Sequence, residues 1–487
     1  MSYLDLTISE IHQALLSKKV TPLELTKEAI QRAKEDSNNA FEIILEEKAI
    51  EKAESLGEPQ DNLFWGIPYV AKDNISTKDI PTTGSSNILN GYVPLYDASI
   101  IERLNDAGAI LIGKATLDEL AMGGTGTTGH LGITYNPWDK DHKRLVGGSS
   151  CGSAASVAAG VIPFSLGSDT GDSVRKPASY AGLVGFKPTW GRIPRFGLFP
   201  FAPSLDHVGY FTRSVEDAAS LLEVLAGHDD RDMTSSYKEV EKYSEYVKKD
   251  CKDIKIGVCN QIVDAITDLE VKNTFLDNVK KLQENGVSVT FFDFDVNMLK
   301  AIFPAYFVIS CSEATSCNAN LDGIKFGPRA EGKSFQEVMM GARSKGFSEL
   351  IKRRFVIGSY SLMRDNQDEL FNRSKKVRRR IVNAMNNLFE HFDILYGPAA
   401  PSIAPEIGSK SDALSNEYLI ADNHLAIGNF GGFPSLTLPI GIKNGMPFGG
   451  NVTGRAFEDG KVFQIAKLIE DITGLKNISV LNKGGNK

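Results

Sequence analysis

Two serines and a lysine in this sequence have the residue types that covalent catalysis requires. Ser149 lies in the string GGSSCG, and Ser173 lies 24 positions later in the string GDSVR. A serine hydroxyl is a poor nucleophile unless a base takes its proton. No histidine lies near these strings, but Lys72 follows the apolar stretch GIPYVA. Because burial lowers the pKa of a lysine, a buried Lys72 is a candidate for that base.

The segment around the two serines has the composition of a tightly packed site. Residues 145–200 contain ten glycines and the small-residue run SAASVAAG at 153–160. Glycines permit turns with positive φ, and small residues let backbones approach closely. Interleaved valine, isoleucine, phenylalanine and leucine exclude a solvated linker. We expect a packed core that exposes backbone N–H groups at an active-site floor.

The overall composition limits the classes of function. The chain has 487 residues, a formal net charge of −7, 42% apolar and 24% charged residues, which is typical of a soluble globular protein. The acidic balance argues against wholesale wrapping of nucleic acid. The five cysteines form no C-x-x-C pair, and the seven histidines show no metal-ligand spacing, so we expect reduced thiols and no metal site. No stretch is typical of a signal peptide or a membrane-spanning helix, which favours a cytoplasmic or organellar-matrix location without membrane attachment.

Alternating apolar strands and helices must position these side chains. Residues 1–60 are expected to be helical, with Thr7 and Thr21 as N-caps, and 64–71 and 109–113 are expected to be buried strands. The alternation predicts an α/β fold. The charged stretch 228–251 is expected to be a surface excursion, and an α/β part is expected over 252–480.

Three other sequence patterns suggest functional sites, but each has weaker support than the two serines and the lysine. The string GAILIGKA at 108–115 approaches a phosphate-binding loop but has alanine where magnesium binding needs serine or threonine. The string GSSCG at 148–152 matches a nucleophile elbow, but a poor strand precedes it. The basic run KKVRRR at 375–380 is either a solvated helix face, which we favour, or a contact for RNA phosphate.

The ordered motifs together resemble the amidase signature family. They are AKDN around Lys72, GGSSCGSA around Ser149, GSDTGDSVRKP around Ser173, and GFKPT and GRIPRFGL after them. The resemblance covers essentially the whole chain and is densest between 145 and 215. It implies a single domain over 1–487 with a catalytic core at 65–215. The implied fold is the amidase-signature α/β fold, with a central mixed β-sheet covered on both sides by helices.

The resemblance also implies roles for individual residues. Lys72 corresponds to the family's base and Ser149 to a relay serine that follows a cis peptide bond. Ser173 corresponds to the nucleophile. An oxyanion hole would form from the backbone N–H groups of Thr170, Gly171, Asp172 and Ser173. The family usually has glycine where Asp172 stands, and a carboxylate pointing into the hole would oppose the developing oxyanion.

Within the family, the chain most resembles the A-type subunits of glutamyl-tRNA(Gln) and aspartyl-tRNA(Asn) amidotransferases. The similarity lies in LDELAMGG at 117–124, in DGIKFG at 322–327 and in GPAAP at 397–401. It implies that glutamine is bound by Tyr306, Arg354, Asp422, Met122 and Gly123. Arginine can bind a carboxylate bidentately, and aspartate can bind an ammonium. These subunits commonly have a glutamate at an ammonia tunnel where this chain has Thr127.

The expected function is therefore that of a glutaminase subunit. Its ammonia would pass to a partner that amidates misacylated Glu-tRNA(Gln) or Asp-tRNA(Asn) in a heterotrimer with subunits B and C. No cofactor is expected in this chain, since ATP and magnesium would be used by the partner. Two alternatives stay open: an independent amidase acting on a small amide, and a catalytically weakened scaffold subunit, which Asp172 suggests.

Overall fold

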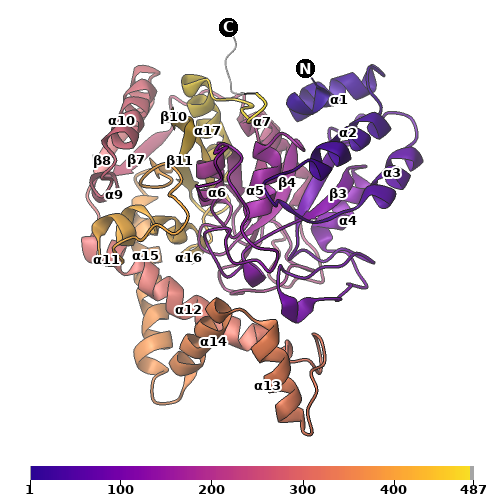
Figure 1. Cartoon of the computed structure of the whole chain (residues 1–487). Coiled ribbons are helices and arrows are strands. Elements are labelled where there is room, and N and C mark those ends of the chain that lie inside the picture. Colours follow the sequence, from indigo (N-terminus) through magenta and orange to yellow (C-terminus); the bar gives the residue numbers. More distant parts are fainter. Residues whose placement is uncertain (1, 483–487) are drawn as a thin grey trace.

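One mixed β-sheet of 11 strands runs through the molecule (Figure 1). The computed structural model describes residues 2–482. The strands are β1 (Phe41–Ile44), β2 (Pro68–Lys72), β3 (Ile110–Ala115), β4 (Phe164–Asp169), β5 (Val184–Lys187), β6 (His207–Thr212), β7 (Lys255–Cys259), β8 (Ser288–Phe292), β9 (Ile394–Pro398), β10 (Ser435–Lys443) and β11 (Met446–Gly454). Their order in the sheet is β1-β3-β2-β4-β6-β5-β10-β11-β9-β7-β8. Strands from both halves of the chain thus join one sheet, because β5 pairs with β10.

Helices surround this sheet. They are α1 (Ile8–Leu16), α2 (Pro22–Lys34), α3 (Glu46–Ser55), α4 (Ser99–Asp106), α5 (Cys151–Ala158), α6 (Arg175–Ala181), α7 (Val215–Leu225), α8 (Tyr243–Tyr246), α9 (Asn260–Asp264), α10 (Leu269–Glu284), α11 (Val296–Lys300), α12 (Ile302–Cys317), α13 (Phe335–Gly346), α14 (Glu349–Leu362), α15 (Arg373–Leu388), α16 (Ile427–Phe430) and α17 (Asp459–Thr473). Short helical turns lie at Tyr3–Asp5, Asn87–Leu89, Glu119–Ala121, Asn318–Asn320, Asp368–Asn372, Glu417–Ala421 and His424–Ala426.

Both faces of the sheet are covered, as neighbouring residues of β6 show. The Tyr210 hydroxyl donates to the carbonyl of Ala218 in α7 at 2.6 Å. A Cβ built at Gly167 of β4 would lie 3.1 Å from the Phe211 ring and 3.0 Å from the hydroxyl of Ser150, just before α5. Successive side chains of a strand point to opposite faces, so α7 and α5 cover opposite faces. The expected fold class is confirmed.

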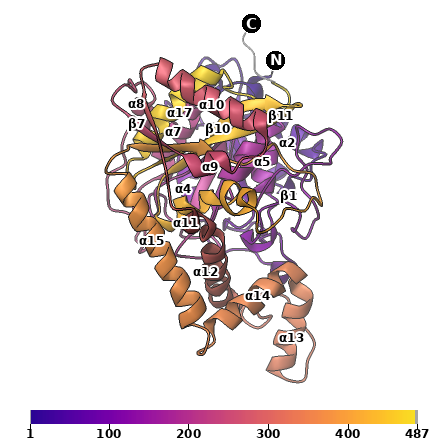
Figure 2. The ribbon, with the colours of Figure 1, turned by 90° about the vertical axis from the view of Figure 1, so that its left-hand side faces the viewer.

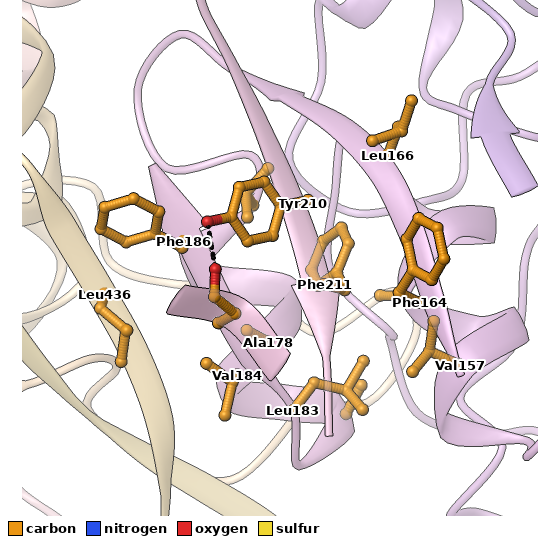
Figure 3. Close-up of a cluster of buried hydrophobic side chains, with 14 of the residues drawn as sticks. Val157, Phe164, Leu166, Ala178, Leu183, Val184, Phe186, Tyr210, Phe211 and Leu436 are labelled. Carbon is orange, nitrogen blue, oxygen red and sulfur yellow. Dashed lines mark hydrogen bonds between the residues drawn. The ribbon is translucent and has the colours of Figure 1, made fainter. Parts of the chain in front are cut away.

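A buried aromatic and aliphatic cluster fills the centre of the sheet (Figure 3). Phe164, Phe186 and Phe211 are fully buried there. The Phe164 ring stacks on that of Tyr69 in β2, with centroids 5.3 Å apart. This packing fixes β2 against β4 and thereby the positions of the groups at their ends.

The parallel strands β2 and β4 end at the same edge of the sheet. Ala71 is paired with Leu166, so Lys72 at the end of β2 lies beside the last residues of β4. The turn that carries Ser173 begins directly after β4. In open α/β sheets, the carboxyl ends of strands are where sites form.

The N-terminal 60 residues are less uniformly helical than the sequence predicts. Thr7 and Thr21 cap α1 and α2 with complete capping boxes, as expected. Residues Phe41–Ile44, however, form the edge strand β1, antiparallel to β3. All four are half-buried, so they lack the alternation that identifies a strand from sequence.

The segment 228–251 is not wholly a surface excursion. Most of its residues are exposed or half-buried, but Tyr243 is buried. The hydroxyl of Tyr243 accepts a hydrogen bond of 2.7 Å from Arg192, which also bonds the carbonyl of Lys238. These contacts tie the segment to the region just after β5.

Three helices, α12, α13 and α14, project from the sheet-containing body (Figures 1 and 2). A Cβ at Gly358 of α14 would lie 2.1 Å from the carbonyl oxygen of Cys311 in α12, so only glycine permits this close packing. The pair brings Tyr306 and Arg354 to the same region. Across residues 2–482, no helix combines the length and apolar character required to cross a bilayer.

Candidate active site

Lys72 lies at the centre of a buried hydroxyl cluster. Its Nζ lies 2.8 Å from the Ser149 hydroxyl, 3.0 Å from that of Ser150 and 2.9 Å from that of Ser168. The side-chain amide of Asn74 donates to the same Ser168 hydroxyl at 3.0 Å. The lysine is fully buried and forms no ion pair with any carboxylate of residues 2–482.

The environment of Lys72 favours the neutral amine. Burial lowers the pKa of Lys72 to about 7, and the carboxylates of Asp118, Asp169 and Asp206 only partly oppose that shift. A neutral amine has a lone pair that can accept a proton from Ser149. The group can therefore act as a general base near neutral pH.

Ser149 is presented by an unusual turn. The peptide bond between Gly148 and Ser149 is cis. A Cβ at Gly148 would lie 2.0 Å from the Asp118 carboxylate, so glycine is required there. The backbone N–H of Asp118 donates to the carbonyl of Ser149 at 3.1 Å. Together these contacts orient the Ser149 hydroxyl toward Lys72.

Ser173 lies in a turn whose backbone N–H groups are free. The carbonyl of Ser173 accepts a hydrogen bond of 3.2 Å from the N–H of Ser150, which places the two serine-bearing turns side by side. Within the described part of the chain, the N–H groups of residues 170–173 have no acceptor. Four adjacent free donors form a ready cradle for an anionic oxygen. The Ser173 side chain is 4% exposed.

Only two of the three expected catalytic residues are joined by a hydrogen bond among the described residues. Lys72 and Ser149 are joined directly, but among the hydrogen bonds of residues 2–482 none links the hydroxyls of Ser149 and Ser173. Hydrogen bonds of catalytic groups are often completed only when substrate binds. A proton path from Ser173 to Lys72 therefore needs a hydrogen bond between the two serines that forms with the substrate.

A buried ion pair fixes both ends of the nucleophile turn. Arg175 and Asp169 are fully buried and 2.9 Å apart. Arg175 also donates to the carbonyl of Gly171 at 2.7 Å, while Asp169 accepts the N–H of Val174 at 3.0 Å. Burial alone would raise the pKa of Asp169, but Arg175 outweighs burial and lowers it well below its usual range. The turn is thus held with its carbonyls bonded and its N–H groups free.

Tyr306 in α12 reaches this turn, and Arg354 in α14 lies over the ring of the neighbouring Phe307. A Cβ built at Gly171 would lie 2.9 Å from the Tyr306 hydroxyl, so the phenol covers the N–H cradle. Arg354 lies 5.1 Å from the centroid of the Phe307 ring. Its Nε and Nη1 are buried and, among residues 2–482, have no acceptor. A half-buried guanidinium with two such unbonded nitrogens is well suited to bind a carboxylate.

Asp422 and Asp172 share one lysine. Lys176 Nζ lies 2.8 Å from Oδ2 of Asp172 and 3.0 Å from Oδ1 of Asp422. The Asp172 side chain is therefore engaged in an ion pair, which settles its orientation. Asp422, expected to bind an ammonium, already has one oxygen bonded to Lys176.

Met122 and Gly123 lie in a loop packed against the Ser149 turn. Met122 is fully buried, and a Cβ at Gly123 would lie 2.5 Å from Asp118. The Asp118 carboxylate accepts backbone N–H groups from the following residues, Thr127 among them at 3.0 Å. The Thr127 hydroxyl lies 2.8 Å from that of Thr125.

Three site residues are absent from the sequence-based prediction. Ser150 and Ser168 contact Lys72, and Lys176 joins the two acidic residues. Ser168 lies near the end of β4, beside the end of β2, and no strand is predicted from the sequence at that position. Lys176 lies four positions after Asp172, the spacing at which helical charges pair.

Comparisons with known proteins agree with this geometry. Residues 24–463 match the family described as Amidase. The A-type subunit of glutamyl-tRNA(Gln) amidotransferase from Pediococcus pentosaceus is 39% identical over 97% of this chain and 98% of its own length. The crystal structure of the corresponding subunit from Thermotoga maritima covers 100% of this chain and 99% of its own, with TM-score 0.79 and 32% identity.

A more distant structure shares the fold alone. Native peptide amidase from Stenotrophomonas maltophilia is 24% identical, with TM-score 0.79 over 96% of each chain. The resemblance inferred from the motifs is therefore confirmed over nearly the full length. This chain belongs to the amidase family.

Proposed function

We propose that this chain is the glutaminase subunit of a tRNA-dependent amidotransferase. The observation that carries the proposal is the buried Lys72, with its pKa near 7, bonded to Ser149 beside a turn with four free N–H groups. The full-length similarity to the A-type subunits of glutamyl-tRNA(Gln) amidotransferases supports the choice of substrate.

The first half-reaction forms an acyl-enzyme. Ser173 Oγ attacks the side-chain amide carbon of glutamine and passes its proton to Ser149, which passes its own proton to neutral Lys72. The developing oxyanion accepts hydrogen bonds from the N–H groups of residues 170–173. Preorganised donors of this kind contribute about 3–4 kcal/mol each.

The second half-reaction releases the products. The C–N bond breaks as a proton returns from Lys72 through Ser149 to the leaving nitrogen, and ammonia departs. Water then attacks the ester, with Lys72 again taking a proton through Ser149. As the intermediate collapses to glutamate, that proton returns through Ser149 to the Ser173 oxygen, so that Ser173 and neutral Lys72 are restored. This sequence uses only side chains and backbone of this chain and needs no metal or cofactor in it.

Substrate recognition is assigned to the groups around the N–H cradle. The unpaired Arg354 binds the α-carboxylate of glutamine, and Asp422 binds the α-ammonium through the oxygen that Lys176 leaves free. Tyr306, Met122 and Gly123 line the path of the side chain. Ammonia passes by Thr127 to a partner that uses ATP and magnesium to activate Glu-tRNA(Gln) or Asp-tRNA(Asn), in a heterotrimer with subunits B and C.

Ammonia release from L-glutamine tests the proposal. The tagged chain is isolated with its co-purifying partners and compared with Ser173→Ala prepared in the same way. Release by the wild type that disappears in Ser173→Ala is the expected result. Release of ammonia from small uncharged amides but not from glutamine would instead favour an independent amidase. No release from any amide, with partners bound, would overturn the enzymatic proposal.

A further inference from the structure

A lysine outside the proposed proton path joins the nucleophile turn to the substrate-binding segment. Lys176 Nζ donates to Oδ2 of Asp172 at 2.8 Å, to the carbonyl of Asp422 at 2.6 Å and to Oδ1 of Asp422 at 3.0 Å. An ammonium has three donors, so these bonds use them all. We call Lys176, Asp172 and Asp422 the cluster. Because Asp172 directly precedes the nucleophile Ser173, the cluster adjoins the reacting atoms.

The ammonium is firmly charged. Lys176 is 7% exposed. Burial alone would lower its pKa, but the charges of Asp172 and Asp422 outweigh burial and raise that pKa well above its usual value. Two carboxylates and one ammonium leave the cluster with one net negative charge.

The positive counterpart is Arg354. The Tyr306 hydroxyl lies beside Gly171, next to Asp172, and Arg354 lies over the ring of the adjacent Phe307. A net negative cluster and a guanidinium with two nitrogens that lack acceptors among residues 2–482 together are complementary to a zwitterion. The site therefore fits an amide that carries both a free α-ammonium and a free α-carboxylate.

We propose that Lys176 is a positioning and specificity-determining residue that acts through Asp172 and Asp422. By binding Asp172, it keeps a carboxylate from opposing the oxyanion on the neighbouring N–H groups. By leaving one net negative charge, it makes the site selective for substrates with an α-ammonium. The proposal deepens the proposed glutaminase function and rests on it for the identity of the substrate.

Three variants that change the net charge of the cluster test this inference through their effects on kcat and KM. Asp172→Asn reduces the net charge of the cluster to zero, so KM for glutamine should rise about tenfold without loss of kcat. Lys176→Gln leaves two negative charges beside the oxyanion, so kcat should fall about 100-fold. The double variant Asp172→Asn with Lys176→Gln has one negative charge again, so both constants should return toward those of the wild type.

The double variant separates a charge effect from a structural one. Losses that simply add in the double variant would overturn the proposal, as would an unchanged kcat in Lys176→Gln. If Lys176→Gln does not fold, an unchanged KM in Asp172→Asn overturns it independently. Lys443→Gln is the matched control, because Lys443 is a partly buried lysine paired with Asp268 away from the site.

A second readout distinguishes this inference from the proposed function. Phenylmethanesulfonyl fluoride is uncharged and modifies an activated serine without binding as an amino acid. Its rate with Ser173 should fall in Lys176→Gln and recover in the double variant, whether or not glutamine is the substrate. A wild type that reacts with the probe but releases no ammonia from glutamine would contradict the proposed function while still deciding the role of Lys176.

Discussion

The Ser168 hydroxyl lies 2.9 Å from Lys72 Nζ and also accepts a hydrogen bond from the Asn74 side chain. Lys72 Nζ donates one N–H to this hydroxyl and another to that of Ser150, which leaves the single lone pair of the neutral amine for Ser149. The contact thus orients the base toward Ser149. Its loss should leave the lysine chemically intact but misdirected.

We expect Ser168→Ala to lower kcat about 10- to 100-fold, since a misplaced catalytic group has a cost of that order. The measurement is steady-state ammonia release together with the thermal unfolding midpoint. Ser165→Ala is the matched control: Ser165 lies in the same strand, is buried and bonds the carbonyl of Ser153 instead. Equal losses in the two variants would contradict a role for Ser168 in orientation.

Removal of the base should abolish acylation while the fold persists. We expect Lys72→Met to reduce the rate of Ser173 modification and of ammonia release about 10³-fold, the usual worth of a general base. Methionine fills a similar volume, and no carboxylate ion pair is broken. Near-wild-type turnover in a folded Lys72→Met protein would exclude the Lys72 mechanism.

The dependence of kcat/KM on pH should follow the protonation state of Lys72. Lys72 accepts a proton only when neutral, and its pKa is lowered by burial to about 7. The value of kcat/KM should therefore rise about tenfold per pH unit below 7 and level off above it. The measurement is kcat/KM for glutamine between pH 5.5 and about 9, with ionic strength constant. A profile without a rise through this range would show that another group is the base.

Arg354 should affect binding more than chemistry. Loss of a hydrogen-bonded ion pair to the substrate carboxylate costs about 2–3 kcal/mol. We expect Arg354→Gln to raise KM for glutamine about 50-fold while the reaction of Ser173 with the uncharged sulfonyl fluoride is little altered. Arg353→Gln, a neighbouring exposed arginine on the same helix, is the control and should match the wild type. Equal effects on both reactions would indicate a structural role instead.

The Asp169–Arg175 pair should dominate local stability. Both side chains are fully buried, so Asp169→Asn leaves an uncompensated charge, at a cost of about 3–5 kcal/mol in the free energy of unfolding. Denaturant unfolding measures the change. Asp268→Asn keeps its cap acceptor and loses a partly exposed pair with Lys443, for which we expect at most about 1 kcal/mol. Similar costs at the two sites would contradict this assignment.

Much of the site could be predicted because its residues fall in short, ordered motifs. Lys72, Ser149 and Ser173 are identifiable because the ordered motifs that contain them resemble a known family, and the strand that ends at Lys72 follows from an apolar run. Ser150, Ser168 and Lys176 were missed because their roles arise from contacts between segments distant in sequence, or from a charge partner that only the fold reveals. The edge strand at Phe41–Ile44 was missed because its burial is uniform.

The single sheet that spans both halves of the chain separates two tasks. The groups that break the amide bond come from residues 72–173, at the end of β2, just before α5 and in the turn after β4. The groups that select the amide come mostly from residues 306–422. Much of this second set lies on the projecting helices α12 and α14. Evolution could therefore exchange the substrate by altering those helices together with Lys176 and its two carboxylate partners. Redesign for a new amide should begin there while Lys72, Ser149 and Ser173 are left unchanged.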